Sequence, residues 1–263
     1  MKLKTKNLYT LFFILFVFIL FVFILLYVKK YNTKRQIEEH FQTSPSIYYI
    51  NLDESKKRKN KMEKQCSSLQ CIRVSALNGK KMNKNDVLHI LKAPDMRLTN
   101  VACFLSHIKC LEEFLDTYED FCIILEDDVN IDPNLIQKLT TIKNELIRVN
   151  EYPDILFLGG TRVCGRQISD HVMKAVQVHE NCNAGAFGYM ISKRGAQIIL
   201  DNFKKDGIYK MYDHQIRDYF PQMNVLYTNP PLVQHDFNLP SDRLDIDYPK
   251  AYQKLSKSIT YAK

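Results

Sequence analysis

The sequence lacks three patterns that are typical of common functional classes. Its 263 residues include seven cysteines but no C-x-x-C pair, which argues against a simple zinc knuckle. It has no compact cluster of lysine and arginine with interleaved aromatic residues, so nucleic acid is not an expected partner. Internal repeats are absent, and no low-complexity tract occurs outside one apolar run. With 46% hydrophobic and 25% charged residues, the composition is that of an ordinary folded protein.

The apolar run extends from Leu8 to Val28 and contains no charged residue, no glycine and no proline. A helix needs about 20 apolar residues to cross the hydrocarbon core of a membrane. The alternative is a cleaved signal peptide, whose apolar segment is about 7–15 residues long and ends at a small-residue cleavage site. Here the run is longer and is followed by Lys29 and Lys30 without such a site. The sequence therefore predicts a permanent single-pass anchor.

The predicted organisation has four parts: a short N-terminal tail (1–7), a transmembrane helix (8–28), a polar juxtamembrane stem (29–45) and one folded domain (46–263). Lysines flank the apolar run on both sides, so the positive-inside rule is nearly balanced. A short tail and a large C-terminal domain suit a type II orientation. Charge leaves open which side of the membrane the domain occupies.

The cysteines fall into two groups. Cys103, Cys110 and Cys122 lie in apolar patterns and are expected to be buried free thiols. Disulfides between Cys66 and Cys71, or between Cys164 and Cys182, are the alternatives open to a lumenal domain. The sequence does not decide whether either bond forms.

Strand and helix patterns alternate along the folded domain. Asp132 and Pro133 resemble a helix N-cap followed by proline at the first helical position. Helices are expected at about 55–66, 100–118, 133–149 and 192–203, with a short one around 213–216. Strands are expected at 47–50, 71–74, 121–125, 155–158, 186–191 and 225–227. This alternation predicts an α/β sandwich with a mainly parallel central sheet.

The most informative feature is the acidic segment Glu126-Asp127-Asp128, which directly follows the apolar strand 121–125. In an extended segment Glu126 and Asp128 point to the same side and Asp127 to the other. Two carboxylates at the C-terminal end of a buried strand suit Mg²⁺ or Mn²⁺ together with substrate phosphates. The alternative is a solvated acidic turn in which Asp127 or Asp128 caps the following residues. The preceding buried strand favours the metal site.

With these residues in view, the chain resembles glycosyltransferase family 25, which includes bacterial lipopolysaccharide galactosyltransferases and animal procollagen galactosyltransferases. The resemblance covers about residues 46–243 and depends on the order of several short blocks. These blocks are Tyr49–Asp53 with Lys57 and Arg58, Ser75–Lys80, Cys103–His107, Ile123–Val129, Gly188–Ala196, Asp213-His214 and Pro230–Val233.

The resemblance implies a GT-A-like Rossmann-type fold, a UDP-sugar donor (usually UDP-galactose), Mn²⁺ or Mg²⁺, and inversion at the anomeric carbon. The acceptor would be a hydroxyl on a glycan, a glycoprotein or a lipid-linked sugar. By match to the acidic motif, Glu126 and Asp128 would bind the metal, and Asp127 would lie near the ribose or sugar of the donor.

Matched blocks also imply further roles in donor binding. Asn51 would contact the uracil edge or the ribose, Arg58 would approach phosphate, and Ser106 belongs to the matched Ser-His block. The alternative for Arg58 is a solvated charge on a lysine-rich helix.

Two residues remain as candidates for catalysis and metal binding. Asp213 matches the Asp-His block and is the candidate base that takes the proton of the acceptor hydroxyl. The alternative is that Asp213 is a helix N-cap. His235 is a candidate third metal ligand, and its alternative is an ordinary surface histidine.

Two other functional classes compete with a glycosyltransferase. One is a catalytically inactive, membrane-tethered glycan-binding or scaffold protein with the same fold, which predicts loss of the acidic motif or of Asp213-His214. Both are intact. The other is a phosphoryl hydrolase, which needs more clustered ligands for a second metal than this sequence offers.

Overall fold

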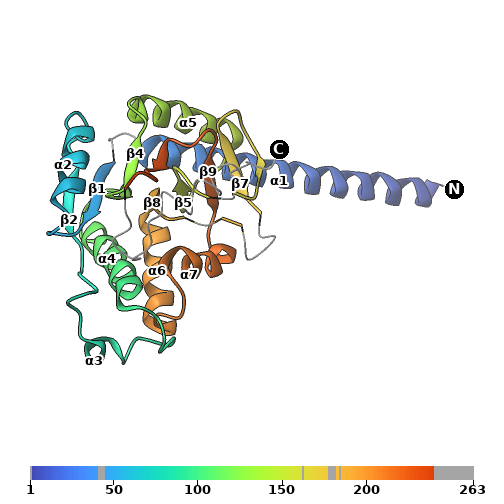
Figure 1. The fold of residues 1–263 in the computed structure, drawn as a ribbon. Coiled ribbons are helices and arrows are strands. Elements are labelled where there is room, and N and C mark those ends of the chain that lie inside the picture. Colours follow the sequence, from blue (N-terminus) through green and yellow to red (C-terminus); the bar gives the residue numbers. More distant parts are fainter. Residues whose placement is uncertain (1, 41–44, 162, 177–181, 184, 240–263) are drawn as a thin grey trace.

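The computed structural model (Figure 1) describes residues 2–40, 45–161, 163–176, 182–183 and 185–239. Part of the predicted stem (41–44), the end of the predicted domain (240–263) and residue 1 of the predicted tail lie outside the described residues. The folded part extends from the first strand at Ser46 to the loop that ends at Leu239.

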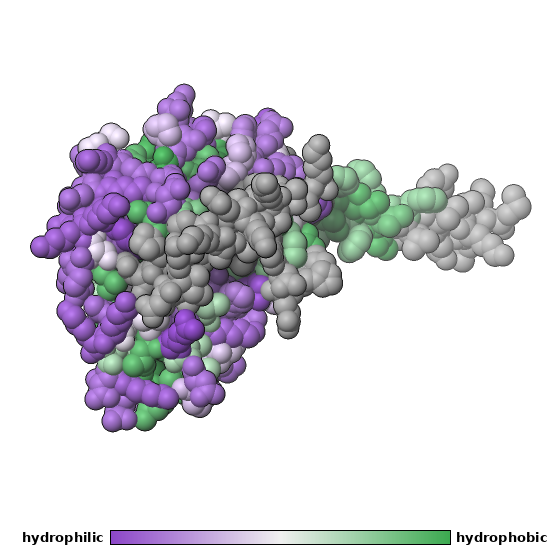
Figure 2. Space-filling model, viewed as in Figure 1, coloured by the Kyte–Doolittle hydropathy of each residue, from purple (hydrophilic) through white to green (hydrophobic). Residues whose placement is uncertain are grey.

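The N-terminal helix α1 (Lys2–His40) projects from the rest of the molecule (Figure 1). Within it, Phe12–Lys29 is long and apolar enough to cross a membrane by length and composition, a test that a signal sequence also passes. This segment is not buried against the folded part, and Figure 2 shows its apolar side chains exposed. The predicted stem continues the same helix as far as His40.

Eight strands form the central sheet, in the order β2-β1-β3-β8-β5-β9-β7-β6. Their bounds are β1 (Ser46–Asn51), β2 (Ile72–Ser75), β3 (Phe121–Glu126), β5 (Ile155–Phe157), β6 (Gly165–Gln167), β7 (Val172–Ala175), β8 (Gly188–Ser192) and β9 (Val225–Thr228). The pairs β1–β2, β1–β3 and β5–β9 are parallel, and the other four are antiparallel. The prediction of a mainly parallel sheet therefore holds for the β2-β1-β3 half, and the sheet as a whole is mixed.

Helices cover both faces of the sheet (Figure 1). One face carries α2 (Lys56–Gln65) and α5 (Leu135–Val149), and the other carries α4 (Leu98–Leu115), α6 (Lys193–Asp206) and α7 (Tyr212–Asp218). Alternate residues of a strand point to opposite faces. In β3, Ile123 and Leu125 accordingly pack towards α2 and α5, whereas Cys122 and Ile124 pack towards α4 and α6. Both faces of β3 are buried, as its continuous apolar sequence predicts.

The smaller elements were not expected from sequence. They are β6 and β7 of the central sheet, α3 (Lys84–Val87), the 3₁₀ turn η1 (Phe220–Gln222) and a second, two-stranded sheet of β4 (Val129–Ile131) and β10 (Val233–His235). β4 directly follows the acidic residues. Its antiparallel pairing with β10 brings the C-terminal part of the described chain beside them.

The start of α5 differs from the prediction that Asp132 is its N-cap. The helix begins at Leu135, its N-cap is Asn134, and the Asp132 side chain accepts a hydrogen bond from the Asn134 amide at 2.8 Å. The Asp132 amide donates to the Leu232 carbonyl at 2.8 Å, so the β4–β10 sheet holds Asp132 outside the helix.

Both candidate disulfides are formed, Cys66–Cys71 and Cys164–Cys182. Cys110 and Cys122 are buried free thiols as predicted, whereas Cys103 is only partly buried. Cys103 lies at the wall of a cavity, which accounts for its partial exposure.

Candidate functional site

The site lies where β1 and β3 end. Because the two strands are parallel and paired, with Ile50 opposite Glu126, their C-terminal ends meet at one edge of the sheet. Asn51 and the loop that follows β1 therefore lie beside the acidic segment. A cavity of about 340 Å³ opens at this edge.

Four chain segments line this cavity. They are the end of β1 with the start of α2 (Ile50, Leu52, Glu54, Ser55, Arg58), the loop after β2 (Ala76–Lys80), one face of α4 (Thr99, Cys103, Ser106, His107) and the acidic segment (Glu126, Asp127, Asp128). Sequence blocks that are far apart in the chain thus form one concave surface.

Arg58 lies at the centre of the charged part of the site. Its Nη1 is 2.6 Å from Asp127 Oδ1 and 3.2 Å from Asp128 Oδ2, and its side chain is only 9% exposed. The alternative of a solvated charge on a lysine-rich helix is therefore wrong. Arg58 is a buried cation that offsets two buried acids.

Asn51 connects this ion pair to the neighbouring strand. Its Nδ2 donates to Asp127 Oδ2 at 2.6 Å, and its Oδ1 accepts from Arg73 Nε at 2.9 Å. Asn51 is 1% exposed and is not among the residues that line the cavity. Its amide holds Asp127, and a contact of Asn51 with the uracil edge or the ribose of a donor stays a prediction.

Asp127 is held by these two partners in a poorly solvated position. Burial raises the pKa of Asp127 to about 6, against the effect of Arg58 and Asn51, which both lower it. Asp127 therefore carries its negative charge at a free-energy cost that a nearby cation lowers.

Asp128 has the features of a metal ligand. Its Oδ2 is 3.2 Å from Arg58 Nη1 and 3.4 Å from His235 Nε2. Its Oδ1 is buried and has no hydrogen-bond partner among the described residues. Buried carboxylate oxygens are rarely left without a partner. Carboxylates with one imidazole are a donor set that suits Mn²⁺, so these residues fit a divalent cation.

His235 reaches Asp128 through the small sheet. β10 is antiparallel to β4 with His235 opposite Val129, and the Asp236 amide donates to the Asp128 carbonyl at 2.7 Å. Its side chain is 21% exposed, so it is not an ordinary surface histidine.

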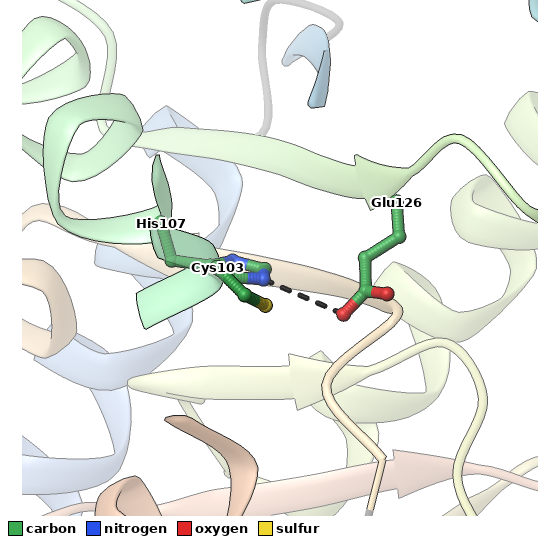
Figure 3. A group of neighbouring side chains, drawn as sticks. All are labelled: Cys103, His107 and Glu126. Atoms are coloured by element: carbon green, nitrogen blue, oxygen red, sulfur yellow. Dashed lines mark ion pairs between the residues drawn. The ribbon is translucent and has the colours of Figure 1, made fainter. Parts of the chain in front are cut away.

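Glu126 lies between two cavities. It lines the large cavity and also a smaller one of about 40 Å³, whose wall includes Cys103, Asp213 and His235. On its other side, Glu126 Oε1 is 3.5 Å from His107 Nε2 (Figure 3). The two cavities thus share Glu126 and Cys103.

Asp213 lies in the first turn of α7, whose N-cap is Met211, so the alternative that Asp213 caps the helix is wrong. Its Oδ2 accepts a hydrogen bond from the Gly185 amide at 3.1 Å. Gly185 has φ of +90°, a conformation that favours glycine. Asp213 faces the smaller cavity.

Ser106 connects α4 to the loop after β2. Its hydroxyl donates to the Ala102 carbonyl at 2.6 Å and accepts from the Leu77 amide at 2.9 Å. The Ser106 hydroxyl thus holds the loop after β2 against α4, and both of these segments line the large cavity.

Sequence reasoning did not assign His107 or Cys103 to the site. His107 appears in the sequence analysis only as part of a matched family block, and Cys103 was expected to be a buried thiol. The signal that would have found them is their spacing, because residues four apart share one face of a helix.

Comparisons with known proteins identify the family. The family model described as glycosyltransferase family 25 (LPS biosynthesis protein) matches residues 44–216, which include Glu126, Asp127, Asp128 and Asp213.

Similar proteins include a glycosyltransferase 25 family member of Drosophila pseudoobscura pseudoobscura, 27% identical over 60% of this chain and 27% of that protein. A glycosyltransferase 25 family member of Aedes aegypti is 23% identical over 72% of this chain and 32% of its own length. Procollagen galactosyltransferase 1 of Danio rerio is 23% identical over 74% of this chain and 33% of its own length. The chain thus spans about a third or less of the length of these relatives.

The family match covers more than half of the chain and includes β1, β2 and β3, the parallel strands of the central sheet that end beside the acidic residues. On this evidence, the chain belongs to glycosyltransferase family 25.

Proposed function

We propose that this chain is a metal-dependent, inverting glycosyltransferase with a GT-A-like arrangement of its site. It transfers a sugar, galactose in our proposal, from a UDP-sugar to a hydroxyl of a glycan, glycoprotein or lipid-linked acceptor. The observation that carries the proposal is Asp128, a buried carboxylate with one oxygen that has no partner among the described residues, at the rim of a 340 Å³ cavity. The family and a relative named procollagen galactosyltransferase 1 support the reaction class and the sugar.

Glu126, Asp128 and His235 would hold Mn²⁺ or Mg²⁺. When bound, such a cation stabilises the negative charge that develops on the departing diphosphate. Glu126 is the last residue of β3, and Asp128 lies in the turn between β3 and β4, so the strand alternation expected from sequence ends at Glu126. All three residues line one or both of the two adjoining cavities.

Arg58 and Asp127 would prepare the donor site. Arg58 would offset the charge of the two aspartates and hold them by direct contacts of 2.6 and 3.2 Å. Asn51 holds Asp127 from the other side, and Ser106 sets the wall formed by the loop after β2. The site is therefore rigid before a substrate enters, which lowers the free-energy cost of ordering it during the reaction.

Asp213 would take the proton of the acceptor hydroxyl. An inverting transfer requires the acceptor oxygen to attack from the face opposite to the departing diphosphate, with a base beside it. Asp213 faces only the smaller cavity, whereas Arg58 and Asp127 face only the larger one. This separation suits a donor bound in the larger cavity and an acceptor bound in the smaller one, with the two substrates in contact near Glu126.

The N-terminal helix would anchor the enzyme as a single-pass type II protein. The exposed apolar stretch Phe12–Lys29 and the two disulfides in the folded part support this arrangement. Disulfides persist in oxidising compartments, so we place the folded part on the non-cytoplasmic side.

Donor hydrolysis and transfer by the full-length chain in mild detergent test the proposal, with UDP-sugars screened with and without Mn²⁺. Asp128→Asn keeps the size of the side chain and removes its charge. We expect it to lower turnover by at least about a hundredfold, the effect of removing one electrostatic contact to a transition state. Asp201→Asn, a change at an exposed residue of α6, is the matched control and should leave turnover unchanged. Asp213→Asn should lower turnover while UDP affinity in the presence of Mn²⁺ is retained.

Turnover that survives chelation, or that is equal in Asp128→Asn and the unmodified chain, would contradict metal-dependent transfer. Calorimetry distinguishes the alternative function. Glycan binding without UDP affinity and without turnover would favour an inactive glycan-binding protein.

A further inference from the structure

Cys103, His107 and Glu126 form a compact group of three different metal-ligating side chains (Figure 3). Cys103 and His107 lie one turn apart on α4 and share a face of that helix, and Glu126 ends β3. One potential ligand atom from each residue lies within 4.8 Å of the other two. The group is distinct from the Asp128–His235 pair, although Glu126 also lines a cavity with Asp128 and another with His235.

The spacing of two of these atoms suits a shared metal ion. His107 Nε2 and Glu126 Oε1 are 3.5 Å apart. A direct charge-assisted hydrogen bond between them would be about 2.7–2.9 Å long. Two ligands at about 2.0–2.1 Å from a tetrahedral Zn²⁺ lie roughly 3.4 Å apart. The observed His107–Glu126 distance is therefore close to the spacing of two ligands of one zinc ion.

The other ring nitrogen of His107, Nδ1, lies within hydrogen-bond distance of a tyrosine hydroxyl. It is 3.1 Å from the Tyr189 hydroxyl, which is 2.9 Å from the Tyr212 hydroxyl. The His107 ring also stacks on the Tyr212 ring at 4.1 Å between centroids. In the tautomer that donates Nδ1–H to Tyr189, the Nε2 lone pair faces Glu126. Metal-binding histidines are commonly oriented in this way by a partner of the other nitrogen.

From this geometry we propose that Cys103, His107 and Glu126 form a Zn²⁺ site. Binding would convert the Cys103 thiol into a thiolate ligand, with its proton released to solvent. Thiolate and imidazole ligands select Zn²⁺ over the hard cations Mg²⁺ and Mn²⁺. Cys103 and Glu126 line both cavities, so the fourth coordination position faces a space that water or a substrate enters.

The site has a consequence for activity that rests on the proposed function. Glu126 is also a proposed ligand of the catalytic Mn²⁺ or Mg²⁺. A zinc ion bound by Cys103 and His107 would also bind Glu126, which would then not be available as a ligand of the catalytic metal. Zn²⁺ would therefore inhibit transfer. Loss of Cys103 would relieve this inhibition without removing any of the three proposed catalytic-metal ligands.

Co²⁺ is a suitable probe because a cobalt–thiolate bond produces a charge-transfer absorption band in the near ultraviolet. The full-length chain, purified in detergent without thiol reductant, should show this band on addition of Co²⁺, and Zn²⁺ should displace it. We expect Cys103→Ser to abolish the band. Cys110→Ala, which changes a buried free thiol elsewhere on α4, should retain it. Tyr189→Phe should weaken Zn²⁺ affinity by roughly ten- to a hundredfold.

The absence of the band in the unmodified chain, or its persistence in Cys103→Ser, would overturn the zinc site. Spectroscopy and turnover separate the two proposals. A cobalt band in a chain without Mn²⁺-dependent turnover would support the zinc site and contradict the proposed function. Mn²⁺-dependent turnover that Zn²⁺ inhibits equally in the unmodified chain and in Cys103→Ser would contradict inhibition through this site.

Discussion

Arg58 is a buried cation that faces two buried carboxylates. The charge of this one residue therefore makes a large contribution to the stability of the site. Removing one member of a buried ion pair leaves the others without compensation, which typically costs about 3–5 kcal/mol. We expect Arg58→Met to lower the free energy of unfolding by this amount, measured by urea titration of the full-length chain with circular dichroism.

Lys59→Met provides the matched control for Arg58. Lys59 is the next residue of α2, its side chain is 41% exposed, and its ion pair with Glu63 is a surface pair. Such pairs contribute only about 0–1 kcal/mol. Equal destabilisation by the two variants would contradict the role given to Arg58.

The local pattern indicated the residues of the acidic segment, whereas Asn51 and Arg58 were named only through the family resemblance and not as partners of Asp127. Glu126, Asp127 and Asp128 follow an apolar strand, and that local pattern placed them at a sheet edge. Arg58 lies 69 residues before Asp127, and no local pattern distinguishes it from the neighbouring lysines of α2. Its role follows only from the pairing of β1 with β3.

At the scale of elements, α5 is joined to the turn between β6 and β7 by one buried carboxylate. Glu145 accepts hydrogen bonds from the Ser169 hydroxyl at 2.7 Å and from the His171 amide at 2.9 Å. Burial raises the pKa of Glu145, but these bonds and the His171 ring outweigh burial, so the pKa lies below its ordinary value of 4.5. The folded state therefore favours the ionised form.

This shift predicts how stability depends on pH. A carboxyl group with a lowered pKa in the folded state stabilises the protein above its unfolded pKa, and this contribution is lost as the pH falls below about 4.5. We expect Glu145→Gln to lower stability at pH 7 and to reduce the loss of stability between about pH 5 and pH 3, measured by thermal melts. Glu112→Gln, at an exposed position of α4, should change neither. An unchanged pH profile in Glu145→Gln would contradict the argument.

The small sheet shows why element prediction failed at the site. β4 and β10 have three residues each, too few for a periodic pattern. Their position depends on contacts with the end of β5, where the Leu232 and Val233 amides both donate to the Leu158 carbonyl. A Cβ at Gly159 would meet the Val233 carbonyl, so glycine is required for this close approach. His235 is brought to Asp128 by these contacts.

At the scale of the whole molecule, the cysteines divide into disulfides and free thiols. Two disulfides use four of the seven cysteines, which leaves three thiols (7 − 4 = 3). Burial raises the pKa of the Cys110 and Cys122 thiols, which lowers their reactivity, whereas Cys103 is partly exposed. The thiols should therefore differ in their reaction with an alkylating reagent.

Mass spectrometry after alkylation tests this arrangement on the full-length chain. Without reductant we expect one label, on Cys103, in the folded protein and three labels after unfolding. Reduction before unfolding and alkylation should give seven. Seven labels without reductant would show that the disulfides are absent, and the placement of the folded part in an oxidising compartment would then have no support.

By itself the sequence determined the features that depend on neighbouring residues: the apolar stretch of α1, the main helices and strands, the acidic end of β3 and the family. The first three follow from composition and from periodicities of two to four residues, and the family follows from the resemblance of several short blocks in a fixed order. The tertiary structure alone decided the mixed strand order, the burial of Arg58, the approach of His235 to Asp128 and the grouping of Cys103 and His107 with Glu126. The reason is that each of these depends on which strands pair and how loops cross, and pairing between distant segments leaves no periodic trace in the sequence.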